Sequence, residues 1–81
     1  MELNADMVQS QIQRIINEDP TIEEAKHIIV SVEKRGFWLF GKEVIVLKGN
    51  VHADTDRVKA KKAATLHAAG REVMDEISVL H

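Results

Sequence analysis

The chain has 81 residues, of which 44% are hydrophobic and 30% are charged, and its formal net charge is −2 at pH 7. This length suits one small domain, and the composition is that of a folded protein rather than a disordered chain. The absence of cysteine excludes disulfides, cysteine-ligated metal sites and a thiol nucleophile. We therefore expect a single domain over residues 1–81.

No apolar run approaches the ~18 residues that a membrane-spanning helix needs. The opening residues, Met1-Glu2-Leu3-Asn4-Ala5-Asp6, are acidic and polar and do not form a secretory signal. The expected location is cytoplasmic if the chain is complete and periplasmic if a leader is missing.

Residues 5–17 are predicted to form the first helix, with Asn4 as its N-cap. The helix should end near Asn17, because Asp19 precedes Pro20 and is driven out of the helical region. The apolar residues of this segment share one helical face: Val8, Ile12, Ile15 and Ile16.

Residues 26–33 and 43–51 are predicted strands, joined as an antiparallel hairpin by a connection that contains glycine. In the first strand, Ile28, Val30 and Val32 should face the core. A glycine inside a strand marks a bulge or the close approach of another backbone. We therefore expect Gly49 to let the second helix pack tightly on the sheet.

That second helix is predicted over residues 55–69, with Asp54 as N-cap, Asp56 in its first turn and an end at Gly70. Its apolar face should consist of Val58, Ala63, Leu66 and Ala69. Residues 73–80 form the third predicted strand. The order α-β-β-α-β predicts an α+β fold in which two helices pack on one face of a three-stranded mixed sheet.

This order and three segments resemble the BON family of small bacterial domains, over about residues 5–80. Residues 45–51 are similar to the family's apolar-x-Leu-x-Gly-x-Val strand, residues 54–60 to its Arg-x-x-Ala step, and residues 73–79 to its last strand. Residues 69–71 lack the family's Gly-Val pair, and the insertion 36–41 is longer and more aromatic than usual. The resemblance implies a non-enzymatic module that binds phospholipid membranes or, in some members, other ligands or proteins.

All aromatic residues of the sequence lie within four consecutive positions, flanked by glycines and basic residues. Tryptophan prefers the water–bilayer interface, and basic residues nearby attract anionic headgroups. The predicted membrane- or partner-binding loop consists of Lys34, Arg35, Phe37, Trp38, Leu39, Phe40 and Lys42. The sequence leaves open the alternative that the rings fold back over a thin core.

A second basic cluster flanks the predicted apolar face of the second helix and consists of Arg57, Lys59, Lys61 and Lys62. We interpret it as a secondary basic rim that contacts anionic lipid or an acidic partner. The alternative is a solvated flank, in which the lysine stems cover apolar surface.

Other classes of function have little support in the residues. The spacing of His52, Asp54 and Asp56 is a weak metal motif, and we expect no metal and no cofactor. No serine lies in a glycine-flanked elbow, so we expect no enzyme. A KH-type clamp is absent, and we expect no nucleic-acid binding. The leading prediction is peripheral attachment to an anionic phospholipid membrane; the alternative is protein or small-ligand binding through the same loop, in an unknown oligomeric state.

Overall fold

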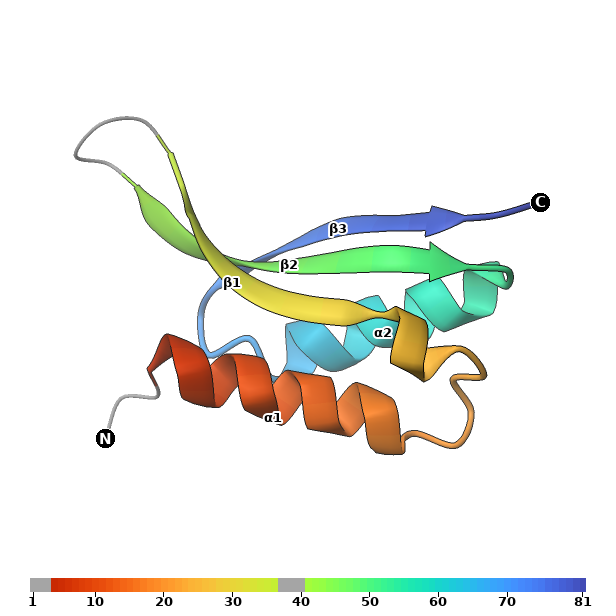
Figure 1. Cartoon of the computed structure of the whole chain (residues 1–81). Helices are drawn as coiled ribbons and strands as arrows, with labels where there is room; N and C mark the ends of the chain where they lie inside the picture. Colours follow the sequence, from red (N-terminus) through yellow and green to blue (C-terminus); the bar gives the residue numbers. More distant parts are fainter. Residues whose placement is uncertain (1–3, 37–40) are drawn as a thin grey trace.

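The computed structural model describes residues 4–36 and 41–81 (Figure 1). The predicted order α-β-β-α-β is confirmed, with a single 3-10 turn inserted before the first strand. The elements in chain order are α1 (Ala5–Glu18), η1 (Ala25–His27), β1 (Ile29–Arg35), β2 (Lys42–Val51), α2 (Asp54–Leu66) and β3 (Glu72–Val79).

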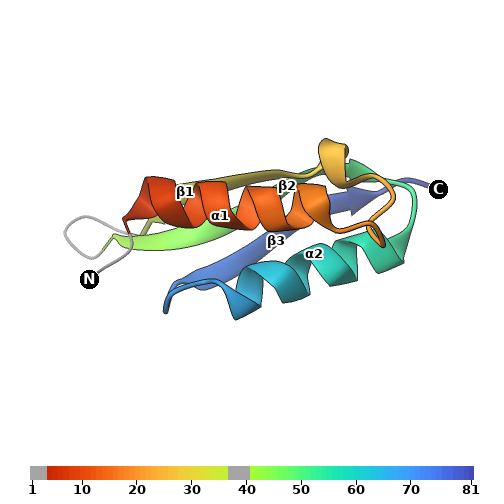
Figure 2. The same ribbon diagram turned by 90° about the horizontal axis from the view of Figure 1, so that it is seen from below.

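The three strands form one mixed sheet in the order β1-β2-β3. The β1–β2 hairpin is antiparallel, with Val32 opposite Ile45, and β3 runs parallel to β2, with Ile77 opposite Gly49. A parallel neighbour requires a crossover, and α2 supplies it. Both helices therefore cover the same face of the sheet, as Figures 1 and 2 show. The α+β fold expected from the sequence is the fold observed.

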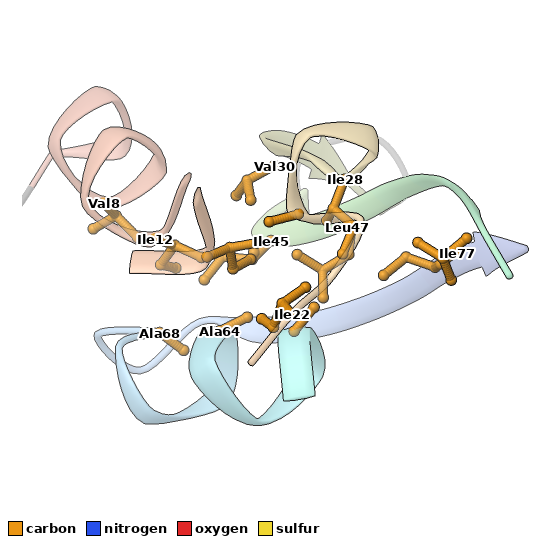
Figure 3. Packing of buried hydrophobic residues seen from close by; sticks show 14 residues of the cluster. Val8, Ile12, Ile22, Ile28, Val30, Ile45, Leu47, Ala64, Ala68 and Ile77 are labelled. Carbon is orange, nitrogen blue, oxygen red and sulfur yellow. The ribbon is translucent and has the colours of Figure 1, made fainter. Parts of the chain in front are cut away.

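The first helix follows its sequence pattern closely. The Asn4 Oδ1 atom accepts a hydrogen bond from the Met7 N–H at 2.9 Å, so the predicted N-cap is confirmed. Val8, Ile12 and Ile16 are all fully buried against the sheet. This stripe packs with inward side chains of β1 and β2 in the core shown in Figure 3.

The second helix buries a different face from the one predicted. Val58 is 53% exposed and Leu66 is 71% exposed, whereas Ala60 and Ala64 are buried, as is Ala68 just after the helix. The alanines recur every four residues, and their small side chains let the helix lie close to the sheet. The larger apolar residues are left on the outer side of α2, so the expected core positions of Val58 and Leu66 are wrong.

The ends of α2 also differ from the prediction. Its N-cap is Ala53, which makes no side-chain capping bond, and Asp54 is already helical. The Asp54 carboxylate instead pairs with Arg57 at 2.7 Å. The helix ends at Leu66, and Ala69 and Gly70 both have positive φ, at 53° and 82°. Two successive left-handed residues explain why the helix stops before the predicted end at residue 69.

Gly49 is the point of closest approach between two backbones. Its φ is 130°, and a Cβ atom added there would overlap the carbonyl oxygen of His27. The predicted close approach is therefore confirmed, but the approaching backbone belongs to η1 and not to α2. The residues before β1 turn in a 3-10 helix, so β1 begins at Ile29 instead of residue 26.

The face of the sheet without helices carries two buried valines, Val44 and Val46. Ion-paired side chains of the three strands lie around them. Arg35 binds Glu33 at 3.0 Å and Glu76 at 2.7 Å, and Lys48 binds Glu33 at 3.0 Å. We infer that the stems of these charged residues cover the valines.

This ion-pair network makes the stability of the domain depend on pH in the acidic range. Hydrogen bonds from Lys48, Arg35 and Ser31 lower the pKa of Glu33 from 4.5 to about 2. A carboxyl with a depressed pKa contributes stability above its unfolded pKa, and that contribution is lost as the pH falls towards the folded value. We expect the thermal midpoint of the native chain to fall more steeply between pH 4.5 and pH 2 than that of Glu33→Gln. Parallel profiles in circular dichroism melts would contradict this.

Candidate functional site

The end of the β1–β2 hairpin is the first candidate surface. In the register of the hairpin, Lys34 lies opposite Glu43 and Arg35 lies opposite Lys42 on the neighbouring strand. The third strand, β3, begins only opposite Val44. The hairpin therefore extends beyond β3, and its end curves away from the helices (Figure 1). Lys34 and Lys42 are exposed, and within the described ranges neither has an ion-pair partner. The predicted loop residues Phe37, Trp38, Leu39 and Phe40 lie outside the described residues.

Arg35 differs from the two lysines beside it. Its guanidinium donates to Glu33 and reaches across the sheet to Glu76 at 2.7 Å. The structure thus places Arg35 in the network over the helix-free face, with its charge already matched by two carboxylates. The basic groups available at the hairpin end are those of Lys34 and Lys42.

The secondary basic rim on α2 also contains both residues that bond within the fold and residues without an ion-pair partner in the described ranges. Arg57 binds Asp54 at 2.7 Å and Asp75 at 3.1 Å, and Lys59 donates to the Thr21 carbonyl at 3.0 Å. Lys61 and Lys62 are exposed and make no ion pair within residues 4–36 and 41–81. Arg57 and Lys59 of the predicted rim therefore make contacts within the fold, whereas Lys61 and Lys62 have no ion-pair partner among the described residues.

An open groove of about 450 Å³ runs along this side of α2. Its volume falls within the range of ligand pockets, ~300–1,000 Å³. The exposed Val58 and Leu66 are the apolar residues of its lining that have large side chains. Its lining residues are Arg57, Val58, Lys61, Lys62, Thr65, Leu66 and Asp75. The sequence placed these apolar residues in the core and so did not predict the groove.

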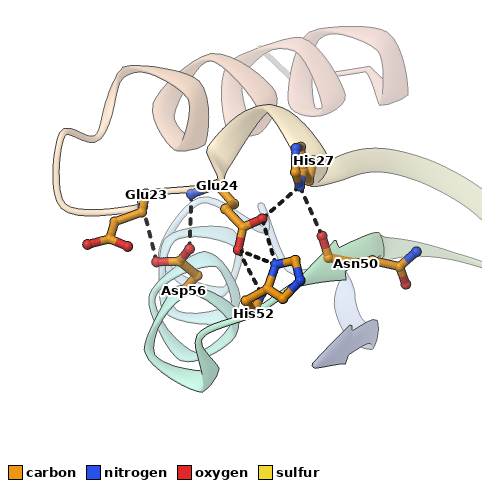
Figure 4. A network of polar contacts seen from close by, with 6 residues as sticks. All are labelled: Glu23, Glu24, His27, Asn50, His52 and Asp56. Carbon is orange, nitrogen blue, oxygen red and sulfur yellow. Dashed lines mark hydrogen bonds and ion pairs between the residues drawn. The ribbon is translucent and has the colours of Figure 1, made fainter. Parts of the chain in front are cut away.

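The sequence also did not predict a polar cluster near the start of β1 and the end of β2, which Figure 4 shows. Asp56 is only 1% exposed, and its two carboxylate oxygens accept the backbone N–H groups of Glu23 and Glu24 at 3.1 and 3.0 Å. Asp56 thus fixes the connector before η1 to the first turn of α2. The sequence did carry one indication that Asp56 is buried, because Asp56 lies four residues before Ala60 and so on the same helical face as the buried alanines.

Glu24 extends the same cluster towards the sheet. Its carboxylate accepts the His52 N–H at 2.7 Å and contacts the Nδ1 atoms of His52 and His27 at 3.1 and 3.0 Å. The bonds from the backbone and ring of His52 hold the pKa of the Glu24 carboxyl below its ordinary value. His27 also contacts the Asn50 carbonyl at 3.3 Å, so the cluster ties η1 to the end of β2.

The weak metal motif of the sequence does not converge in space. His52 binds Glu24, Asp54 binds Arg57, and the Asp56 oxygens are taken by backbone N–H groups. Within the part of the chain that the structure describes, no three or more His, Cys, Asp or Glu side chains gather where they could hold a metal ion. We assign a structural role to this cluster.

Comparisons of the chain with protein-family models, curated proteins and solved structures found no significant match. The structure itself defines the class, which is a small α+β domain with two helices on one face of a three-stranded mixed sheet. Among the described residues, none of the helices combines the length and apolar character needed to cross a bilayer.

Proposed function

We propose that the chain is a non-enzymatic binding module that attaches peripherally to anionic phospholipid membranes through residues 34–42. The observation that carries this proposal is the position of Lys34 and Lys42. Both are exposed and free of ion pairs among the described residues, at a hairpin end that extends beyond β3. The four apolar residues between them in sequence, at 37–40, supply the interfacial contact.

The fold supports this use of the hairpin. The extended end leaves the two lysines clear of the helices, and each basic residue near an anionic leaflet contributes about 1 kcal/mol. Arg35 supports the hairpin from within, because its charge is matched by Glu33 and Glu76. The order of elements also agrees with the BON-like architecture that the sequence resembles, and membrane binding is what that resemblance implies.

Co-sedimentation with anionic and neutral liposomes, followed by Trp38 fluorescence, tests the proposal. Trp38 is the only tryptophan of the chain, so the signal has one source. We expect binding to anionic vesicles with a blue shift, weakened by salt because exposed charges are screened. The double variant Lys34→Glu/Lys42→Glu should reduce binding at least tenfold, since it reverses both charges. Phe40→Ala should also weaken binding while leaving the thermal midpoint nearly unchanged.

The matched control is Lys61→Glu/Lys62→Glu on α2, which makes the same change in net charge at a different surface. If both double variants lose binding equally, attachment follows overall charge and residues 34–42 are not the site. If the native chain does not sediment with anionic vesicles at low salt, the proposed function is wrong.

A further inference from the structure

The two outer edges of the sheet differ in what occupies them. On β1, the Gln13 side chain donates to the Ile28 carbonyl and accepts the Val30 N–H, both at 2.8 Å, and Gln9 donates to the Val30 carbonyl at 3.0 Å. The Gln13 amide bonds to the backbone as a neighbouring strand would. The edge of β1 is therefore closed by α1 at Ile28 and Val30.

The edge of β3 is occupied at Ile77 and open on either side of it, at Asp75 and Val79. The Leu80 N–H donates to the Val51 carbonyl, so even-numbered residues direct their backbone groups to β2 and odd-numbered residues direct theirs outward. Of the outward N–H groups, that of Ile77 is bonded to the Asp75 carboxylate at 3.1 Å. The outward groups of Asp75 and Val79 have no hydrogen-bond partner in the described ranges. An open edge of this kind is a template for another strand.

The groove on α2 lies beside this edge. Asp75 of β3 is one of its lining residues, and Val58 and Leu66 of α2 are its large apolar ones. A strand added to β3 would place every second side chain over α2. Lys61 and Lys62 lie beside the position of these side chains, and neither lysine forms an ion pair with a carboxylate of the described residues. The groove therefore favours acidic residues in the added strand.

A second copy of this chain does not suit the site. Figure 2 shows α2 lying along β3, on the outer side of the sheet. Paired strands lie about 4.8 Å apart, whereas packed helices need about 8–10 Å between their axes. Two copies joined along β3 would force their α2 helices together and bring Lys61 and Lys62 against their own counterparts. The occupant that fits is a single extended segment without a helix of its own.

We propose that an extended peptide of alternating apolar and acidic residues, supplied by a partner protein, adds to the outer edge of β3 and packs its side chains over α2. Main-chain hydrogen bonds to Asp75 and Val79 provide the register. Val58 and Leu66 contact the apolar residues, and Lys61 and Lys62 bind the acidic ones. This binding site is separate from the hairpin end assigned to membranes.

Titration of the 15N-labelled domain with a synthetic heptapeptide that alternates valine and glutamate tests the proposal by NMR. We expect a dissociation constant below about 1 mM, with shift changes centred on β3 and α2. The outward amides of Asp75 and Val79 should gain protection from hydrogen exchange, whereas those of Met74 and Glu76 already bond to β2 and should change little. This alternation distinguishes strand addition from contact by side chains alone.

The matched peptide alternates valine and lysine and should bind at least tenfold more weakly. Lys61→Glu/Lys62→Glu should reverse that preference, and both substitutions are on the exposed side of α2, where folding is unaffected. Val79→Pro removes one outward N–H and should also weaken binding. The proposal is wrong if the acidic peptide causes no shift at β3 at about 1 mM, or if both peptides bind alike. It is also wrong if only anionic vesicles perturb these amides.

Discussion

Gly49→Ala is expected to remove about 4 kcal/mol from the free energy of unfolding, a large part of the stability of so small a domain. A residue with a side chain is strained at a φ of 130°, at a cost of about 1–3 kcal/mol. The new Cβ would also overlap the His27 carbonyl, and a backbone oxygen cannot move aside as a flexible side chain can. Separating η1 from β2 would break the packing of Ile28 in the core. Urea unfolding followed by circular dichroism measures this loss.

Gly41→Ala provides the matched control. Among the described residues, a Cβ atom at Gly41 meets nothing within 4 Å, and the φ of Gly41 is not in the left-handed region. That variant should stay within about 0.5 kcal/mol of the native chain, as surface substitutions usually do. Equal urea midpoints for Gly49→Ala and the native chain would show that η1 does not approach β2 in the way described.

The second large effect is expected at Asp56. Asp56→Ala removes the acceptor of two partly buried N–H groups, those of Glu23 and Glu24, and an unsatisfied donor costs about 1–3 kcal/mol when it is buried. We expect a total loss of about 3 kcal/mol. Asp56→Asn keeps one acceptor oxygen and should lose about half as much. Thermal and urea unfolding of both variants give the comparison.

Asp54→Ala is the control from the same turn of α2. Asp54 is exposed and pairs with Arg57, and exposed ion pairs are worth about 0–1 kcal/mol. If Asp54→Ala and Asp56→Ala destabilise the domain equally, the buried carboxylate is not what holds the connector to α2. A loss confined to Asp56 would confirm the role given to it.

The sequence predicted the fold class because local signals and the hydrophobic pattern agreed over most of the chain. In α1, the cap Asn4 and the stripe of Val8, Ile12 and Ile16 point to the same helix and the same buried face. In β2, residues 44–47 are apolar and mostly β-branched, which favours a strand buried on both faces. Where the local signals and the hydrophobic pattern agree, the element and its buried face can be predicted without knowledge of the tertiary contacts.

The buried face of α2 could not be predicted by size and hydrophobicity. Val58 and Leu66 are larger and more apolar than Ala60 and Ala64, yet the alanines are buried because the helix lies close to the sheet. That distance is set by tertiary packing, which the sequence does not display. The four-residue spacing of the alanines was a better guide than their individual hydrophobicity.

The polar cluster around Asp56 was hidden for another reason. Its bonds join Asp56 to Glu23 and Glu24, more than thirty residues earlier in the chain. Such contacts carry no local pattern, so the sequence indicated only that Asp56 suited the first turn of a helix. The contacts of the basic rim could not be predicted for the same reason. The ion pair of Arg57 with Asp75 forms only because the crossover brings β3 beside α2.

The glutamines of α1 have a consequence for how the molecule can assemble. Polymerisation through sheets needs two receptive edges on each subunit, one to accept a neighbour and one to offer to the next. Gln9 and Gln13 occupy the start of one of these edges, because they bond to the backbone groups of Ile28 and Val30. A strand that approached β1 would have to displace these glutamine side chains or pair only beyond Val30. Addition of a strand at β3 is therefore favoured over addition at β1, and this difference opposes growth of the sheet through both edges.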